Sequence, residues 1–290
     1  MNNFSWQIWR DRRGRVSPLR IAALALLLFP LAKALVDAGA IANGARPLND
    51  LIHRAGFWAL IFLGVTLAVT PFRRIARYGA LSDVRRMLGV GTFFYVVAHL
   101  VLYVADQRYD IAKIAHELTH RVYLIVGGIA WLGLAALAAT STDGMVRRLG
   151  GLRWRRLHQA IYAIALLALI HYFQQTKADI SVPTFVAGLF TWLVGYRLLA
   201  WWQGGGELST LRLLALAVVV SILTFAGEAI GIGITFGVSP LRVLETAFDF
   251  EAGIRPGWQV LAAGLAVVAV DFLRARWNSQ PSRPRSAVAK

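Results

Sequence analysis

The stretch RLHQAIYAIALLALIHYF, residues 156–173, is apolar enough to cross a lipid bilayer and carries a histidine near each end, His158 and His171. A helix needs about 20 mostly apolar residues to span the hydrocarbon core, and fewer when its ends reach the polar headgroups. Ionisable side chains are costly at that depth, so they indicate function, although a histidine can also simply hydrogen-bond a neighbouring helix. The segment predicts a membrane helix that carries a site.

The composition of the whole chain is typical of a membrane protein. Of its 290 residues, 57% are hydrophobic and only 16% are charged, whereas soluble domains carry about 25% charged residues. The net charge of +16 comes from arginines that cluster at the ends of apolar runs, which suits orientation in a membrane and not nucleic-acid binding. The chain has no cysteine, which excludes disulfides, iron–sulfur clusters, thiolate-ligated haem and covalently attached haem.

Eight apolar segments are long enough to be transmembrane helices. They are residues 20–37, 54–71, 88–105, 122–140, 158–173, 183–201, 211–233 and 258–273. Pro71, Pro183 and the GGG run at 204–206 lie at boundaries between these segments. We predict an all-α integral membrane protein, a bundle of about eight transmembrane helices.

The distribution of basic residues predicts the orientation of the bundle. The segments on the N-terminal side of the membrane hold 22 of the 31 lysines and arginines, whereas most acidic residues lie on the other side. The N-terminal side is therefore cytoplasmic, and an even number of spans returns the C-terminus there. We expect a multi-pass protein of the bacterial inner membrane, in contact with membrane lipids, with residues 1–19 as a cytoplasmic N-terminus and 274–290 as a disordered cytoplasmic tail.

A cleaved signal peptide within residues 1–40 is the alternative for the first span. A basic segment, an apolar stretch from Ile21 and small residues around DAGAIANGA favour it. The apolar stretch is long for a signal peptide, however, so we favour an uncleaved first helix.

The predicted topology gives His99 and His171 the same depth in the membrane. His99 lies about 13 residues from the cytoplasmic Arg86 along the third span, or roughly 20 Å at 1.5 Å per residue. His171 lies as far from His158 along the fifth span, which runs in the same direction. Two imidazoles at one depth on facing helices are what a six-coordinate b-type haem requires. We predict that His99 and His171 are axial haem ligands in the outer half of the membrane.

The remaining membrane histidines are weaker candidates. On an ideal helix His158 and His171 point about 140° apart, so they need not share a partner helix. His158 lies at the cytoplasmic boundary, where an ordinary interfacial residue is the alternative to a ligand. At its level the third span offers only Arg86 and Met87. His53 stands beside Arg54 at the outer end of the second span, where polar residues are also ordinary.

Residues 116–120 read HELTH, which matches the H-E-x-x-H pattern of zinc metalloproteases. In that reading His116 and His120 bind zinc and Glu117 is the general base, but the site needs a third ligand. Glu228 and Glu245 are available only in unrelated sequence, so a polar loop helix is the favoured interpretation. The GVG string at 89–91 and the GGG string at 204–206 follow no strand and lack the spacing of a nucleotide-binding loop, so we expect no NAD(P)H domain.

Several strings in consistent order resemble one family over about residues 50–200. They are HRAGFWALIFLGVTLAVTPFRR (53–74), VRRMLGVGTFFYVVAHLVLY (84–103), RVYLIVGG (121–128) and TSTDGMVRRLGGLRWRRLHQAIYAIALLALIHY (140–172). The family is that of the haem-binding membrane subunits of periplasmic methionine sulfoxide reductase systems (MsrQ, also called YedZ), within the ferric-reductase-like transmembrane superfamily. RVY in place of R-P-Y and one extra residue in LGGLRW depart from the family pattern, and neither affects a histidine.

The resemblance implies a specific function and set of cofactors. It implies b-type haem and FMN, and it carries the haem ligands over to His99, His158 and His171, with His53 at a further recurrent position. It also implies that electrons come from the quinone pool or a cytosolic flavin reductase. They would pass to a periplasmic molybdopterin subunit that reduces methionine sulfoxide.

We therefore expect an electron-transfer subunit and not the catalytic subunit of the system. Residues 20–203 would form a six-helix ferric-reductase-like core, and residues 204–273 would form an extension of two further spans whose role the resemblance does not cover. The alternatives are a membrane zinc protease using His116, Glu117 and His120, and a transporter or scaffold that holds no cofactor.

Overall fold

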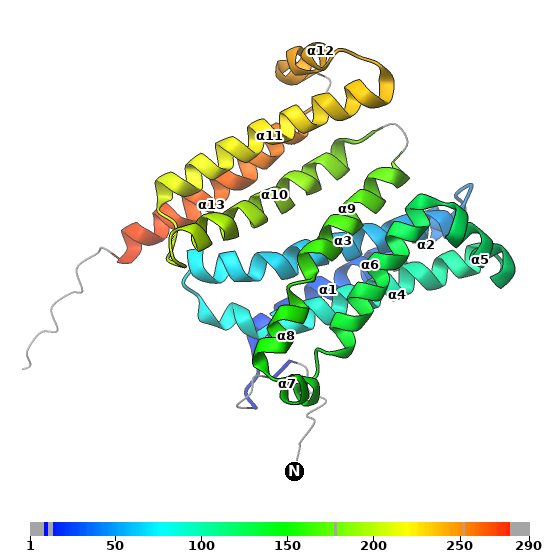
Figure 1. Ribbon diagram of the computed structural model, residues 1–290, viewed down its shortest axis with the longest axis horizontal. Coiled ribbons are helices and arrows are strands. Elements are labelled where there is room, and N and C mark those ends of the chain that lie inside the picture. Colours follow the sequence, from blue (N-terminus) through cyan, green and yellow to red (C-terminus); the bar gives the residue numbers. More distant parts are fainter. Residues whose placement is uncertain (1–8, 11–13, 177–178, 252, 279–290) are drawn as a thin grey trace, which may run out of the picture. The chain divides into compact units, whose positions relative to one another are not determined.

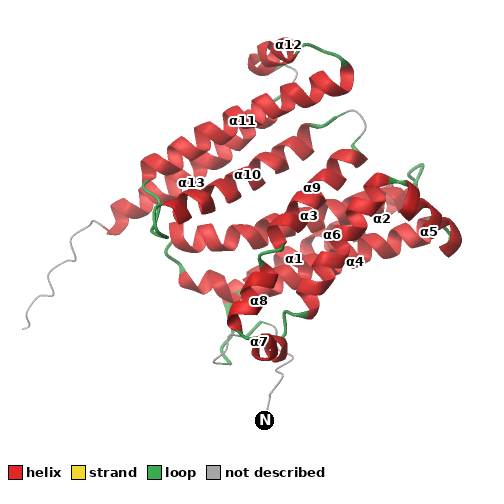
Figure 2. Cartoon of the chain, viewed as in Figure 1, coloured by secondary structure: helices red, strands yellow, loops and turns green. Residues whose placement is uncertain are grey.

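The structure is a computed structural model that describes residues 9–10, 14–176, 179–251 and 253–278. Within these residues the regular elements are helices, and none is a strand (Figure 2). Eight of the described helical segments are long and apolar enough to cross a membrane. They are Pro18–Val36, Pro47–Ile75, Gly79–Asp106, Val122–Ala139, Gly151–Gln175, Ser181–Trp202, Thr210–Phe236 and Pro256–Arg276. The prediction of an all-α multi-pass membrane protein is confirmed.

The chain divides into two compact units. Unit 1 comprises residues 1–73 and 79–187, and unit 2 comprises residues 74–78 and 188–290. The division falls within α10 (Ser181–Trp202), between Ala187 and Gly188, whereas the predicted core ends after this helix, at residue 203.

Besides the start of α10, unit 1 contains five of the eight candidate membrane spans and the short helices that join them (Figure 1). Its elements are α1 (Pro18–Val36), α2 (Ala38–Ala42), α3 (Pro47–Ile75), η1 (Gly79–Asp83), α4 (Arg85–Asp106), α5 (Ile111–His120), α6 (Val122–Ala139), α7 (Asp143–Leu149), α8 (Gly151–His158) and α9 (Ile161–Gln175). The loop helix α5 connects α4 to α6, and α7 and α8 connect α6 to α9 at the other end of these helices.

The first part of unit 1 packs α1, α3 and α4 around aromatic side chains. Phe62 of α3 is fully buried, and its ring centre lies 5.0 Å from that of Tyr95 on α4. The Tyr95 hydroxyl donates a 2.6 Å hydrogen bond to the Leu27 carbonyl of α1. Polar bonds between helices supplement van der Waals packing where lipid surrounds the bundle. These contacts hold α4, the helix that carries His99, against α3.

The second part of unit 1 packs α6 against α9. An added Cβ at Gly133 of α6 would stand 2.8 Å from the side chain of Ile164 on α9, so the two helices approach closely only because position 133 is glycine. The predicted span at 158–173 is interrupted: α8 ends at His158 and α9 begins at Ile161. The 140° estimate for His158 and His171 assumed one ideal helix, so it does not apply across this break.

Two helices extend beyond their predicted ends. α3 continues through Pro71 to Ile75, although Pro71 was expected to mark a boundary. A proline removes its own N–H donor and crowds the carbonyl four residues earlier. Transmembrane helices nevertheless tolerate proline, because neighbouring helices and side chains satisfy the freed backbone groups. α13 (Pro256–Asn278) continues past residue 274, the predicted start of the disordered tail. Residues 279–290 and 1–8 lie outside the described residues, so the prediction for the rest of the tail and for much of the N-terminus stays a prediction.

Unit 2 packs residues 188–202 of α10 with α11 (Thr210–Phe236) and α13, and includes α12 (Pro240–Glu245) and η2 (Thr246–Phe248). Ser209 caps the start of α11, and Gly237 ends it in the left-handed conformation with φ 69°. Ala217 of α11 is fully buried against the position of Gly264 on α13. The Ser221 hydroxyl donates a 2.8 Å hydrogen bond to the Gly257 carbonyl, so small residues and a polar bond join the two helices.

Candidate cofactor site

The structure brings His99 and His171 together. His99 lies on α4 and His171 on α9, and their ring centres are 6.4 Å apart with the ring planes at 87°. Two imidazoles that bind one metal ion from opposite sides have ring centres about 6 Å apart, because each metal–nitrogen bond is about 2 Å. The spacing of the two rings therefore fits a shared metal centre.

Each of these two histidines is oriented by a backbone carbonyl. The Nδ1 atom of His99 lies 2.8 Å from the Ile52 carbonyl oxygen of α3, and the Nδ1 atom of His171 lies 2.8 Å from the Tyr123 carbonyl oxygen of α6. A carbonyl oxygen only accepts hydrogen bonds, so Nδ1 carries the proton in both rings. The lone pair is left on Nε2, which is the usual arrangement of a metal-binding histidine and its hydrogen-bonded partner.

A glycine lies against each ring. An added Cβ at Gly56 of α3 would stand 3.0 Å from Nδ1 of His99, and one at Gly127 of α6 would stand 2.9 Å from Nδ1 of His171. Any larger residue would displace the rings. The sequence alone does not reveal these glycines or the two carbonyls, because their roles depend on how α3 and α6 are placed beside the histidines.

His158 lies in a different environment, at the end of α8. Its ring stacks on Trp154 with centres 4.0 Å apart, and its Nε2 lies 3.2 Å from the Thr140 hydroxyl oxygen. The Thr140 hydroxyl also lies 2.8 Å from the Ala136 carbonyl, which takes its proton. His158 therefore donates from Nε2 and keeps the lone pair on Nδ1, unlike the other two histidines.

A cavity of about 690 Å³ in unit 1 includes His158 in its lining. The residues around it come from α1, α3, α4, α6, α8, α9 and the short helices η1 and α7 with their flanking residues. Four of them are arginines: Arg20, Arg85, Arg86 and Arg147. Arg86 pairs with Asp143 at 2.5 Å. The Nε of Arg20 is buried and has no hydrogen-bond partner among the described residues. The lining holds two aspartates, Asp83 and Asp143, against these four arginines, so the arginines are in excess. An excess of arginines around a cavity fits an anionic group such as a phosphate or a carboxylate.

His53 is exposed and lies next to Ile52, whose carbonyl orients His99. The neighbouring Arg54 forms a 2.8 Å ion pair with Asp37, just beyond the end of α1. Hydrogen bonds from Lys33 and Arg54 hold the pKa of Asp37 below its ordinary value, so this carboxylate stays charged. The structure does not bring His53 into the pair formed by His99 and His171.

The HELTH segment forms the loop helix α5. His116 and His120 stack with ring centres 4.0 Å apart, whereas the Glu117 carboxylate bonds Tyr103 and Arg121. Over the described ranges, no group of three or more His, Cys, Asp or Glu side chains is placed to hold a metal ion. The geometry therefore supports a polar loop helix, the interpretation favoured from the sequence.

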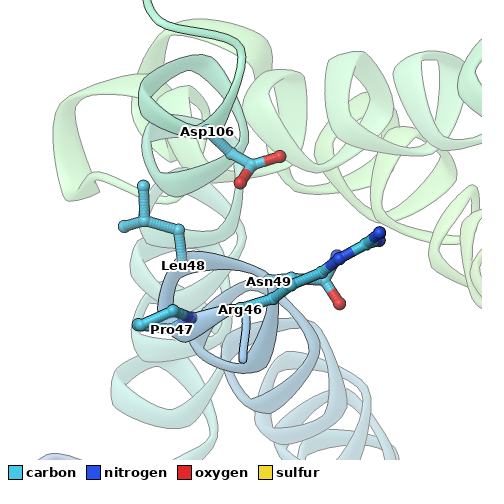
Figure 3. A pocket seen from close by; sticks show the side chains of 5 residues that line it. All are labelled: Arg46, Pro47, Leu48, Asn49 and Asp106. Carbon is cyan, nitrogen blue, oxygen red and sulfur yellow. The ribbon is translucent and has the colours of Figure 1, made fainter. Parts of the chain in front are cut away.

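A second hollow of about 530 Å³ lies where α3 begins and α4 ends (Figure 3). Arg46, Pro47, Leu48 and Asn49 line it from one side and Asp106 from the other. One basic and one acidic residue leave it without a charge preference, and it contains none of the candidate histidines. We assign no cofactor to it.

The comparison with known families places the bundle in a class. The family model described as "Ferric reductase like transmembrane component" matches residues 55–169, from α3 to α9, which include His99 and His158 and end shortly before His171. The helical bundle thus has the fold of a ferric-reductase-like transmembrane component. No solved structure matches the chain.

Individual relatives define the family more narrowly. The chain is 45% identical over 160 residues to the protein-methionine-sulfoxide reductase heme-binding subunit MsrQ of Xanthomonas campestris pv. campestris strain B100, covering 55% of this chain and 73% of the relative. It is 40% identical over 190 residues to the MsrQ protein of Rhodospirillum rubrum, covering 65% of this chain and 89% of the relative. The chain belongs to the MsrQ family, as its sequence strings indicated.

Proposed function

We propose that this protein is a transmembrane electron-transfer subunit that binds b-type haem between α4 and α9, with His99 and His171 as axial ligands. The observation that carries the proposal is the pair of imidazole rings 6.4 Å apart, each with its Nδ1 held by a carbonyl. The names of the relatives, heme-binding subunits of a methionine-sulfoxide reductase, support it.

The residues of the chain have distinct roles in this site. The Ile52 and Tyr123 carbonyls fix the ring orientation of His99 and His171 and increase the basicity of their Nε2 atoms. Gly56 and Gly127 leave room for the rings. Bound haem supplies one-electron redox chemistry, and the protein sets its potential through the ligands and the apolar surroundings.

We propose a second, inner cofactor position at the arginine-lined cavity that includes His158. Its Nδ1 lone pair makes His158 a third candidate ligand of haem iron, and His53 stays a possible additional position. Arg20, Arg85, Arg86 and Arg147 would pair with haem propionates or with the phosphate of FMN, the flavin that the family resemblance implies. Orientation of the protein in the membrane accounts for the arginines outside the cavity.

Two cofactor positions would carry electrons from the cytoplasmic side to the periplasmic side of the bacterial inner membrane, with both chain termini in the cytoplasm. The donor would be the quinone pool or a cytosolic flavin reductase. The acceptor would be a periplasmic molybdopterin subunit that reduces methionine sulfoxide in proteins. The chemistry on the substrate would take place in that subunit, so the present chain would bind cofactors and pass electrons.

Spectroscopy of the purified protein in detergent tests the proposal. We expect a b-type Soret band that shifts on reduction with dithionite, and reoxidation of the reduced protein by the periplasmic reductase and methionine sulfoxide. Iron and zinc should be quantified in the same preparation. A colourless preparation, or stoichiometric zinc without iron, would contradict the proposal and favour a cofactor-free transporter or a metalloprotease.

A further inference from the structure

Glu117 of α5 is engaged by two other parts of unit 1 instead of facing the medium. Its side chain is only 14% exposed, although α5 is a loop helix whose residues are mostly exposed. The Tyr103 hydroxyl of α4 donates a 3.0 Å hydrogen bond to one carboxylate oxygen. Arg121 donates a 3.2 Å hydrogen bond to the other. Both oxygens of this carboxylate therefore have partners.

The contacts of Glu117 continue to His171. Arg121 immediately precedes α6, and its guanidinium also donates to the Tyr123 hydroxyl at 3.2 Å. Tyr123 lies in the first turn of α6, and its carbonyl accepts the hydrogen bond from Nδ1 of His171. The Tyr123 and His171 rings also lie 6.3 Å apart. Residues from α4, α5 and α6 thus meet around the group that orients His171.

We propose that Glu117 is a positioning residue for His171. By bonding Tyr103 and Arg121 it fixes the start of α6, and with it the carbonyl of Tyr123 that holds the imidazole. The inference rests on the proposed role of His171 as a haem ligand. It also gives the HELTH segment a function that involves no zinc.

The geometry makes this network stronger than a typical surface ion pair. An exposed pair contributes about 0–1 kcal/mol because water and salt screen it. Here the carboxylate is largely buried, accepts two hydrogen bonds and joins three helices. Its removal would leave the Tyr103 hydroxyl without an acceptor and the Arg121 guanidinium with only the Tyr123 hydroxyl. The start of α6 would then lose the side-chain link that Glu117 makes to Tyr103 of α4.

Loss of this connection should weaken the hydrogen bond at Nδ1 of His171. That bond raises the basicity of the ligand, and disturbing such outer partners weakens metal binding by about tenfold or more. A less basic imidazole donates less charge to ferric iron, so the reduction potential should shift to a more positive value. Haem content should fall less than on removal of His171 itself.

The test compares Glu117→Ala with His116→Ala, a change in the same helix that leaves the network intact. We expect Glu117→Ala to shift the low-spin electron paramagnetic resonance signal and to raise the midpoint potential, while His116→Ala matches the parent protein. Tyr103→Phe, which removes one hydrogen bond without changing packing, should give a smaller shift in the same direction. If Glu117→Ala does not accumulate in the membrane, the comparison of Tyr103→Phe with the parent protein tests the inference instead. If the low-spin resonance signal and the midpoint potential of these variants equal those of the parent protein, the inference is overturned.

A measurement without haem separates this inference from the proposed function. Hydrogen–deuterium exchange on haem-depleted protein should be faster at residues 121–125 in Glu117→Ala than in the parent protein, and equal exchange would overturn the network. Failure of the haem proposal would appear differently, as a His171→Ala variant with an unchanged haem spectrum.

Discussion

Gly127 of α6 lies directly against the imidazole of His171: an added Cβ would stand 2.9 Å from both Nδ1 and Cε1 of the ring. A Cβ atom essentially never lies this close to a non-bonded atom, so the ring or the helix would have to move. The ring is also held by the Tyr123 carbonyl one turn earlier on the same helix. The backbone of α6 thus determines both the orientation of His171 and the room available to it.

Gly127→Ala should therefore disturb the candidate haem site. We expect a destabilisation of about 1–3 kcal/mol from overpacking, and a clear loss of haem measured as the Soret-to-280 nm absorbance ratio. Gly128→Ala is the matched control, because its Cβ would lie 3.6 Å from a terminal methyl of Leu118, an ordinary contact. Equal haem content in the two variants would argue against a ligand at His171.

Substitution of His158 should affect a different cofactor from substitution of His171. We expect His158→Ala to lower the total of haem and flavin bound per chain while the low-spin signal of the outer site stays as in the parent. The physical reason is that His158 lines the arginine-rich cavity, whose lining includes neither His99 nor His171. Cofactor analysis of purified protein measures this. The inner position would be refuted by a His158→Ala protein with the parent's full cofactor content.

The predicted orientation can be tested by single cysteines, because the natural chain has none. Lys113→Cys on α5 should react with a membrane-impermeant maleimide added to spheroplasts. Arg153→Cys on α8 should react only after permeabilisation, because α5 and α8 lie at opposite ends of the membrane helices. Both positions are exposed in the structure. The reverse labelling pattern would invert the topology and the proposed direction of electron flow.

Unit 2 contains a buried ion pair whose loss should destabilise it. Glu228 of α11 is 2% exposed and lies 3.3 Å from Arg255, which is partly exposed. Removing one member of a buried pair leaves the other charge uncompensated. We expect Glu228→Ala to reduce stability by about 1–3 kcal/mol, seen as a lower unfolding temperature of the full chain in detergent.

Glu228→Gln keeps an acceptor for Arg255, so its unfolding temperature should lie between those of Glu228→Ala and the parent protein. Because the described residues named at the candidate site all belong to unit 1, the haem spectrum of both variants should be unchanged. An unfolding temperature of Glu228→Ala equal to that of the parent would show that the pair adds nothing to stability.

Much of the fold could be predicted from hydrophobic length alone. Eight spans follow from apolar runs, because only helices of about 20 residues satisfy their backbone inside a bilayer. The ends of the helices were less certain. α3 continues past Pro71, and the helix after Gly150 breaks between His158 and Ile161, because capping and packing by neighbouring helices decide such details.

The pairing of His99 and His171 could also be predicted, because depth along a helix depends only on residue count and rise. The surroundings of the pair could not. The carbonyls of Ile52 and Tyr123 and the cavity around His158 depend on how α3, α4, α6 and α8 are rotated about their axes. One sequence does not show these rotations, since nearly every face of a membrane helix is apolar.

The haem spectra of His99→Ala and His171→Ala, compared with His116→Ala, test the central claim most directly. We predict that each of the first two variants loses the low-spin, six-coordinate signal of the outer haem, and that His116→Ala keeps it in full. Membrane insertion of every variant should be checked by quantifying the protein in the membrane fraction. Full retention of the low-spin signal by correctly inserted His99→Ala and His171→Ala proteins would contradict the account.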